Sequence, residues 1–161
     1  MALRQEHRTL PGEAIHIRRY TPDDLEHTVC LWRASKRAAY PYVAVQQRYT
    51  LAEDTAYFRD VVAVHCVVWL AEVAGRLAGL IALKEDFIDQ LYVALEQQRH
   101  EVGTALLQKV REHSPAGLRL YTFQKNLSAR AFYEKHGFHT IRYGVSPALE
   151  HEPDVEYHWR P

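Results

Sequence analysis

The sequence predicts an α/β (α+β) protein whose sheet contains both antiparallel and parallel strand pairs. Two patterns lead to this prediction. Residues 66–73 and 77–83 are apolar runs separated by the turn sequence Ala74-Gly75-Arg76, which is typical of an antiparallel hairpin. Residues 87–93 form another strand pattern, followed by a helical pattern and by a strand at residues 117–123. A right-handed crossover through that helix makes the two strands parallel.

The N-terminal part is expected to contain one strand and two helices. Residues 1–13 hold a Pro-Gly pair and few apolar side chains, so we expect a flexible lead-in before a single domain of residues 14–161. Residues 14–20 alternate as a strand does. Thr21 is a suitable cap, and Pro22 a suitable first residue, for a helix that fades near residues 35–39. A second helix is expected at residues 51–62, with Thr50 as its cap.

The C-terminal part is expected to complete the sheet. A helix is predicted from about residue 128 to residue 136, and Gly137 is well placed to end it. Strands are expected at residues 139–145 and 155–159, with a loop at residues 146–153 between them.

Composition excludes several classes of protein. The chain has 161 residues, of which 47% are hydrophobic and 25% charged, as in an ordinary soluble globular domain. Lys+Arg and Asp+Glu both number 20, which argues against a general nucleic-acid-binding surface. No apolar run is long enough for a membrane span, and the N-terminus lacks the apolar centre of a secretory signal. We therefore expect a cytoplasmic protein.

The cysteines and histidines do not indicate a metal site. Cys30 and Cys66 lie in different predicted elements, and we expect both to be reduced and partly buried. The ten histidines are scattered and form no zinc-ligand spacing.

One stretch, residues 87–110, has the form of a phosphate-binding device. Its strand leads through a polar turn into a helix that carries Val102, Leu106, Leu107 and Val110 on one face. The first amides of a helix have no internal partner, and the helix dipole adds positive potential there. Gly103 allows a ligand to approach the main chain closely. An ordinary strand-to-helix connection explains the same pattern equally well.

Two motifs resemble those of the GCN5-related N-acetyltransferase (GNAT) superfamily. Gln98 and Gly103 match the first and last positions of the family's motif A, Q/R-x-x-G-x-G/A, while Glu101 stands where its first glycine is usual. A second block is similar to motif B, N-x-x-A-x-x-F-Y-x-x-x-G-F, and fills each fixed position: Asn126, Ala129, Phe132, Tyr133, Gly137 and Phe138. The motifs occur in the family's order and cover roughly the last half of the chain.

The resemblance implies a fold and an activity. The fold is a central mixed, mainly antiparallel sheet of about six to seven strands with helices on both faces. The activity is transfer of an acetyl group from acetyl-CoA, as co-substrate, to an amine of a small molecule or peptide by direct attack. Family members often form homodimers, so a homodimer is also possible here.

The resemblance also implies where the coenzyme binds. Its pyrophosphate is expected on residues 98–104, and its pantetheine arm on the main chain of residues 91–93 and on Asn126, which is otherwise a turn or cap residue. The expected coenzyme-binding residues are Leu91, Tyr92, Val93, Gln98, Arg99, His100, Glu101, Val102, Gly103, Thr104 and Asn126. The Glu101 carboxylate repels pyrophosphate unless it points to solvent, which we favour because only the amide is needed.

Two residues are catalytic candidates. By resemblance, Tyr133 donates a proton to the departing thiolate; its alternative is a core aromatic. Asp89 is the candidate base, on the same predicted strand face as Leu91 and Val93. A structural ion pair is an equally weighted explanation of Asp89, and Glu85 is the second choice of base.

The acceptor site is the least determined part. Trp32, Tyr40 and Tyr42 surround a proline-containing break between the first two helices, where the family's acceptor pocket lies. Packing of these aromatic side chains beneath a loop is the alternative. Because Glu101 departs from the family pattern, a non-catalytic acyl-CoA-binding or interaction module is retained as the alternative function.

Overall fold

The computed structural model describes residues 13–98 and 101–161. It contains one seven-stranded sheet in the order β1-β2-β3-β4-β5-β7-β6. The strands are β1 Ile15–Arg19, β2 Val67–Val73, β3 Arg76–Lys84, β4 Phe87–Val93, β5 Leu118–Phe123, β6 His139–Val145 and β7 Pro153–Trp159. The β4–β5 pair is parallel and the other pairs are antiparallel. The mixed, mainly antiparallel sheet is therefore confirmed.

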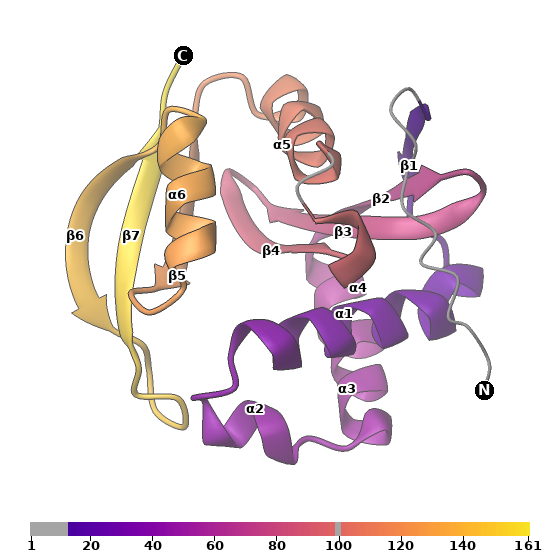
Figure 1. Cartoon of the computed structure of the whole chain (residues 1–161), viewed down its shortest axis with the longest axis horizontal. Helices are drawn as coiled ribbons and strands as arrows, with labels where there is room; N and C mark the ends of the chain where they lie inside the picture. The colour runs from indigo at the N-terminus through magenta and orange to yellow at the C-terminus, as the bar shows by residue number, and fades with distance from the viewer. Residues whose placement is uncertain (1–12, 99–100) are drawn as a thin grey trace.

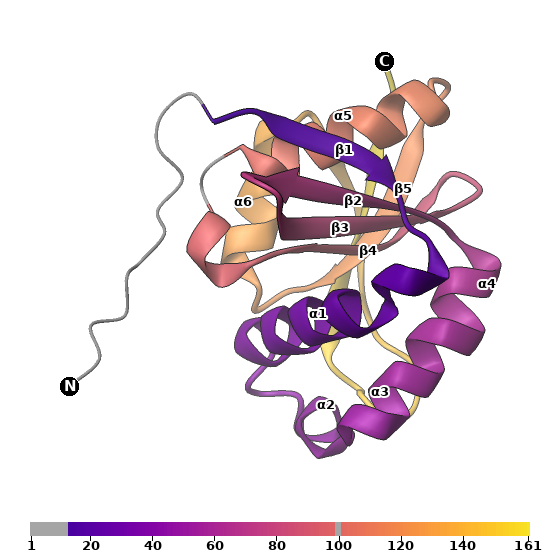
Figure 2. The same ribbon diagram turned by 90° about the vertical axis from the view of Figure 1, so that its right-hand side faces the viewer.

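The helices cover both faces of the sheet (Figure 1). They are η1 Pro22–Asp24, α1 Leu25–Ala39, α2 Ala44–Arg48, α3 Leu51–Tyr57, η2 Phe58–Val62, α4 Ala63–His65, η3 Leu95–Gln97, α5 Val102–His113 and α6 Leu127–Lys135. In the side view, α1 and α3 lie on one side of β2, β3 and β4, and α5 on the other (Figure 2). Within the described residues, no helix has the length and apolar character needed to cross a bilayer.

Two hydrophobic clusters, one on each face, follow from the two-residue period of the strands. On β2, Trp69 and Ala71 belong to the cluster that packs against α5 and α6. Val68 and Leu70 belong to the cluster that packs against α1 and η2. β2 and β3 are thus apolar on both faces, which explains their near-continuous hydrophobic sequence.

The expected helices differ from the observed ones in their details. Thr50 caps α3 as predicted: its Oγ1 accepts from Glu53 N at 3.1 Å, and Glu53 Oε2 accepts from Thr50 N at 2.8 Å. The helix expected at residues 51–62 continues through a π-helical segment to His65. The short helix α2 was not predicted. Cys30 is exposed, so its expected partial burial is wrong, whereas Cys66 is partly buried.

Candidate active site

The sheet opens where β4 and β5 diverge. Their only registered pair is Phe87 with Arg119, and Arg119 N donates to Asp86 O at 3.0 Å. Beyond this point β5 pairs with β7 alone, as far as Phe123. The remaining length of β4 therefore has β3 on one side and no strand pair on the other.

The register of β4 decides which main-chain groups face the opening. Ala94 N donates to Ala78 O at 2.8 Å, and Tyr92 lies opposite Leu80 in the same ladder. Because hydrogen-bonded and non-hydrogen-bonded pairs alternate in an antiparallel ladder, Tyr92 bonds to β3, while the main chains of Leu91 and Val93 point away from it. Of the three residues expected to offer main-chain groups to the coenzyme, Tyr92 is therefore the exception.

The side chains of these strand residues are packed, as expected. Leu91 and Val93 pack against the cluster under α5, and Tyr92 packs against the cluster under α1. Val93 O accepts from Ser35 Oγ at 3.2 Å and from Gln98 Nε2 at 3.3 Å. Gln98 thus ties the end of the polar turn to the end of β4.

The N-terminus of α5 presents main-chain amides at the open end of β4. The first helical bond of α5 joins Ala105 N to Glu101 O at 2.9 Å. The amides of Val102, Gly103 and Thr104 precede this bond and have no acceptor among the described residues. We call these three amides the cradle. Of the residues expected beside it, Arg99 and His100 lie outside the described residues.

Close packing against α6 holds the cradle in place. A Cβ on Gly103 would lie 3.3 Å from Phe132 Cε2, which is closer than a side chain comfortably tolerates. Thr104 Oγ1 lies 3.1 Å from His136 Nε2, and the Val102 side chain is buried in the core. The two motifs are therefore in direct contact at this point.

Glu101 adopts the left-handed backbone conformation, with φ of 65°. This conformation suits the glycine that is usual at this position in the family and is strained for a residue with a side chain. Glu101 is also exposed, as the solvent-pointing interpretation requires. The backbone at this position thus has the conformation that glycine favours, although the residue is a glutamate.

Replacing Glu101 with glycine is expected to stabilise the protein by about 1 kcal/mol, because the left-handed strain is removed. Acetyl-CoA affinity should change by less than about threefold, since a screened, exposed carboxylate has little effect on a ligand bound by amides. Thermal unfolding and calorimetric titration measure the two quantities.

Glu85→Gly is the matched control, because Glu85 is also exposed and left-handed, with φ of 57°, but lies in the β3–β4 turn. If Glu101→Gly tightens acetyl-CoA binding by tenfold or more and Glu85→Gly does not, the Glu101 carboxylate faces the phosphates.

The helix of the second motif begins and ends as predicted. Asn126 caps α6, since its Oδ1 accepts from Ala129 N at 3.1 Å. Gly137 follows the last turn with φ of 83°, which is the left-handed conformation of a helix stop. Asn126 therefore has a capping role.

Tyr133 lies on the face of α6 that is turned toward the sheet, with 7% of its surface exposed. Its ring contacts Phe132, Phe138 and Tyr157 at centroid distances of 5.3, 5.4 and 6.3 Å. Its hydroxyl has no hydrogen-bond partner among the described residues. Burial raises the pKa of Tyr133 well above its usual value, and Tyr40 adds to the shift. Tyr133 therefore keeps its proton at neutral pH.

A cavity of about 1100 Å³ lies next to the opening, and we call it the central cavity. Its walls come from α1, α3, β4, β5, β6 and residues 146–154. Trp32 and Tyr40, two of the expected acceptor-site residues, line it. Tyr42 does not line it: its ring packs 6.2 Å from that of Phe123, and its buried hydroxyl has no hydrogen-bond partner in the described part of the chain.

Asp89 also lines the central cavity. The regular alternation of side chains along a strand does not predict this orientation. Ala82 pairs with Gln90 and Leu83 pairs with Ile88, so Asp89 is the extra residue of a β-bulge. Leu91 and Val93 pack against α5, whereas Asp89 faces the cavity on the side of α1. The prediction that Asp89 shares a face with Leu91 and Val93 is wrong for this reason.

A short chain of hydrogen bonds orients Asp89. Trp32 Nε1 donates to Gln90 Oε1 at 3.0 Å, and Gln90 Nε2 donates to Asp89 Oδ2 at 2.9 Å. None of the ion pairs within the described residues includes Asp89, so the ion-pair explanation has no support. Glu85, the second choice of base, lies in the β3–β4 turn outside the cavity.

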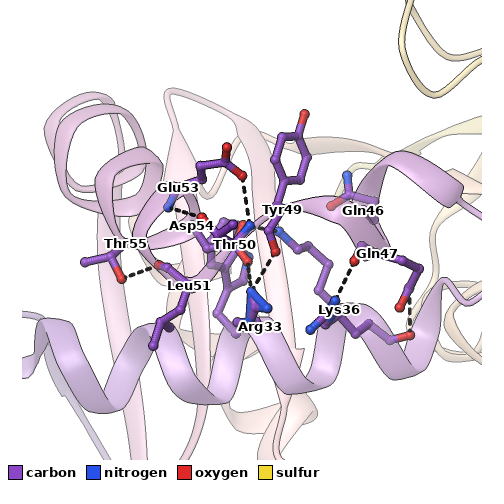
Figure 3. Close-up of polar contacts among 12 residues, drawn as sticks. Arg33, Lys36, Gln46, Gln47, Tyr49, Thr50, Leu51, Glu53, Asp54 and Thr55 are labelled. Atoms are coloured by element: carbon purple, nitrogen blue, oxygen red, sulfur yellow. Dashed lines mark hydrogen bonds and ion pairs between the residues drawn. The ribbon is translucent and has the colours of Figure 1, made fainter.

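A buried ion cluster closes one wall of the cavity (Figure 3). Asp54, 3% exposed, accepts from Arg33 Nη1 at 3.0 Å and from Lys36 Nζ at 3.3 Å. Lys36 Nζ also lies 3.7 Å from the centre of the Trp32 ring. Burial lowers the pKa of Lys36, and Asp54 opposes that shift. The cluster fastens α1 to α3, and its charges are already paired.

Two further acidic residues of the cavity escaped prediction. Glu150 lies in the loop between β6 and β7, and Asp154 lies at the start of β7. The acidic character of residues 150–154 was their only signal in the sequence, and no motif includes them.

Known proteins resemble this chain in sequence and in fold. The model of the acetyltransferase (GNAT) domain matches residues 64–140. The probable N-acetyltransferase Rv2775 of Mycobacterium tuberculosis is 39% identical over 80 residues, which are 45% of this chain and 46% of that protein. The peptidyl-lysine N-acetyltransferase YiaC of Escherichia coli is 29% identical over 126 residues, which are 78% of this chain and 84% of that protein.

Solved structures share the fold. The crystal structure of the PaiA N-acetyltransferase from Thermoplasma acidophilum, in complex with coenzyme A, superposes with a TM-score of 0.69 at 19% identity. The match covers 92% of this chain and 99% of that one.

Proposed function

The chain belongs to the GCN5-related N-acetyltransferase (GNAT) superfamily of acetyl-CoA-dependent enzymes, and we propose that it acetylates a primary amine by direct attack on the thioester. One observation carries this proposal. β4 and β5 part beyond Phe87, and the opening lies between the cradle and the central cavity. Coenzyme and amine can therefore approach one point from opposite sides.

The residues around the opening fit acetyl-CoA. The cradle amides suit the pyrophosphate, because free helix N-terminal amides and the helix dipole both favour anions. The outward-facing main chain of Leu91 and the amide of Val93 suit the amides of the pantetheine arm, as an added strand would pair, whereas Val93 O already accepts from Ser35 and Gln98. Acetyl-CoA supplies the activated acetyl group as a thioester.

Two side chains handle the protons of the reaction. Asp89 accepts a proton from the incoming ammonium, directly or through water, so that the nitrogen attacks in its neutral form. Tyr133, which keeps its proton at neutral pH, donates it to the departing thiolate. Trp32 positions Asp89 through Gln90.

The acceptor is a cationic amine of a small molecule or peptide. Aromatic and acidic side chains of the central cavity favour a positively charged ligand. Because the relative YiaC is a peptidyl-lysine N-acetyltransferase, the lysine ε-amine is a suitable first probe.

The proposal is tested by measuring coenzyme A release with acetyl-CoA and a panel of alkylamines and lysine peptides. Thermal shift with acetyl-CoA alone is measured in parallel. We expect stabilisation by acetyl-CoA and turnover on at least one amine. Stabilisation without turnover on any amine would favour the non-catalytic module, and no stabilisation would contradict both functions.

A further inference from the structure

The charges of the central cavity are not balanced. Its lining includes five carboxylates, Glu53, Asp54, Asp89, Glu150 and Asp154, and two cations, Lys36 and Arg142. Lys36 is paired with Asp54, and Arg142 Nε is paired with Glu156 at 2.6 Å. Within the described residues, Asp89, Glu150 and Asp154 have no ion-pair partner.

Asp154 is a buried carboxylate without an external partner. It is 9% exposed, and no described residue forms a side-chain hydrogen bond or an ion pair with its carboxylate. Burial raises the pKa of Asp154 and the charge of Arg142 opposes that shift, so the fold retains a carboxylate whose burial is only partly compensated. A Cβ on Gly144 would lie 3.1 Å from Asp154 Oδ1, so the missing side chain keeps the carboxylate open to the cavity.

Glu150 is held among the aromatic side chains of the cavity. Gln46 Nε2 of α2 donates to its Oε1 at 2.7 Å. Glu150 lines the central cavity together with Tyr57 and Tyr92. The carboxylate therefore faces the cavity.

We propose that Glu150 and Asp154 form a distal cation subsite, which selects acceptors that carry a second positive charge besides the reacting amine. The reacting nitrogen lies at Asp89 on β4, and the second charge lies at the wall formed by β7 and the loop before it. The ligand class is an α,ω-diamine or a longer chain with a cationic far end. The catalytic part of this inference rests on the proposed function.

Three arguments indicate that Glu150 and Asp154 bind a ligand and do not serve to stabilise the fold. Asp154 stabilises no helix, turn or ion pair among the described residues, and an unpaired buried charge is costly to the fold. The two subsite residues lie in the loop before β7 and at the start of β7, and both line the central cavity. The aromatic rings of Tyr121 and Tyr143 line the same cavity, and their faces favour cations.

The test compares diamines with monoamines of equal chain length, from four to eight carbons. In the unaltered protein, kcat/KM for the best diamine should exceed that of its monoamine by about tenfold or more. Asp154→Asn and Glu150→Gln should each reduce this ratio toward 1, because kcat/KM falls more for the diamine than for the monoamine. Asp60→Asn is the matched control, because Asp60 is exposed, lies outside the cavity and should leave the ratio unchanged.

Two further measurements separate this inference from the proposed function. Calorimetric titration with 1,8-diaminooctane, without acetyl-CoA, should show binding that is weakened about tenfold or more by Asp154→Asn. Thermal unfolding of Asp154→Asn should show no loss of stability, whereas a structural role predicts a loss.

The results of these experiments distinguish the cation subsite from the proposed function. If amines are acetylated without preference for diamines, the proposed function stands and the subsite is wrong. If no amine is acetylated but diamine binding depends on Asp154, the subsite stands and the proposed function fails. If the unaltered protein neither prefers nor binds diamines, the subsite is overturned.

Discussion

Tyr133→Phe is expected to lower kcat by about 100-fold or more, the usual contribution of a positioned general acid. The Tyr133 side chain is buried, its hydroxyl keeps its proton at neutral pH, and no hydrogen bond joins this hydroxyl to another described residue. Its removal therefore takes away the proton for the thiolate and little else. The dissociation constant of acetyl-CoA and the free energy of unfolding should be almost unchanged.

Tyr157→Phe is the matched control for this variant. Tyr157 is fully buried next to Tyr133, but its hydroxyl donates to Glu134 at 2.6 Å and accepts from Arg130 at 3.2 Å. Its loss should lower the free energy of unfolding by about 1–2 kcal/mol and leave kcat unaffected. Unchanged turnover in Tyr133→Phe, measured by coenzyme A release at saturating substrates, would remove Tyr133 from the mechanism.

Asp89→Asn is expected to lower kcat/KM at neutral pH by about 10- to 100-fold, because the amine then loses its proton acceptor. The pH dependence should change as well. Without the base, the rate follows the fraction of acceptor that is already neutral in solution, so kcat/KM should rise tenfold per pH unit up to the pKa of the amine. A pH series of initial rates measures both effects.

Glu85→Gln distinguishes the two candidate bases. Glu85 is exposed in the β3–β4 turn, so its replacement should leave the rate and its pH profile unchanged. Equal losses in the two variants would mean that general surface charge, and not a base at Asp89, controls the rate.

The sequence predicts the strands because their apolar runs are long and are separated by clear turns. β2 and β3 are buried on both faces, and the crossover through α5 determines the direction of β5 relative to β4. Thr50 was identifiable as a cap because a cap depends on local chemistry alone. Asn126 was expected on the coenzyme arm, with capping as the alternative, and the structure shows that it caps α6.

The bulge at Asp89 could not be predicted in the same way. Strand alternation assumes two residues per repeat, and a bulge adds one residue without a distinctive local sequence. The error places Asp89 on the wrong face while leaving its neighbours Leu91 and Val93 correct. Only the pairing partner, β3, reveals the shift.

The lining of the central cavity, which we propose as the acceptor site, was predicted least well, since its walls come from segments distant in sequence. Lys36 pairs with Asp54 across 18 positions, and Gln46 bonds to Glu150 across 104 positions. No periodicity or spacing in a single sequence encodes such contacts. Trp32 and Tyr40, which were expected at the acceptor site, line the cavity, but Tyr42 is also aromatic and lies outside it.

The most direct test of the account is a titration of ¹⁵N-labelled protein with coenzyme A, followed through the main-chain amide signals. We predict that the signals of Val102, Gly103 and Thr104 shift most, together with those of Leu91 and Val93 along the opening. Large shifts elsewhere, with these five amides unmoved, would contradict the cradle and with it the proposed binding of acetyl-CoA.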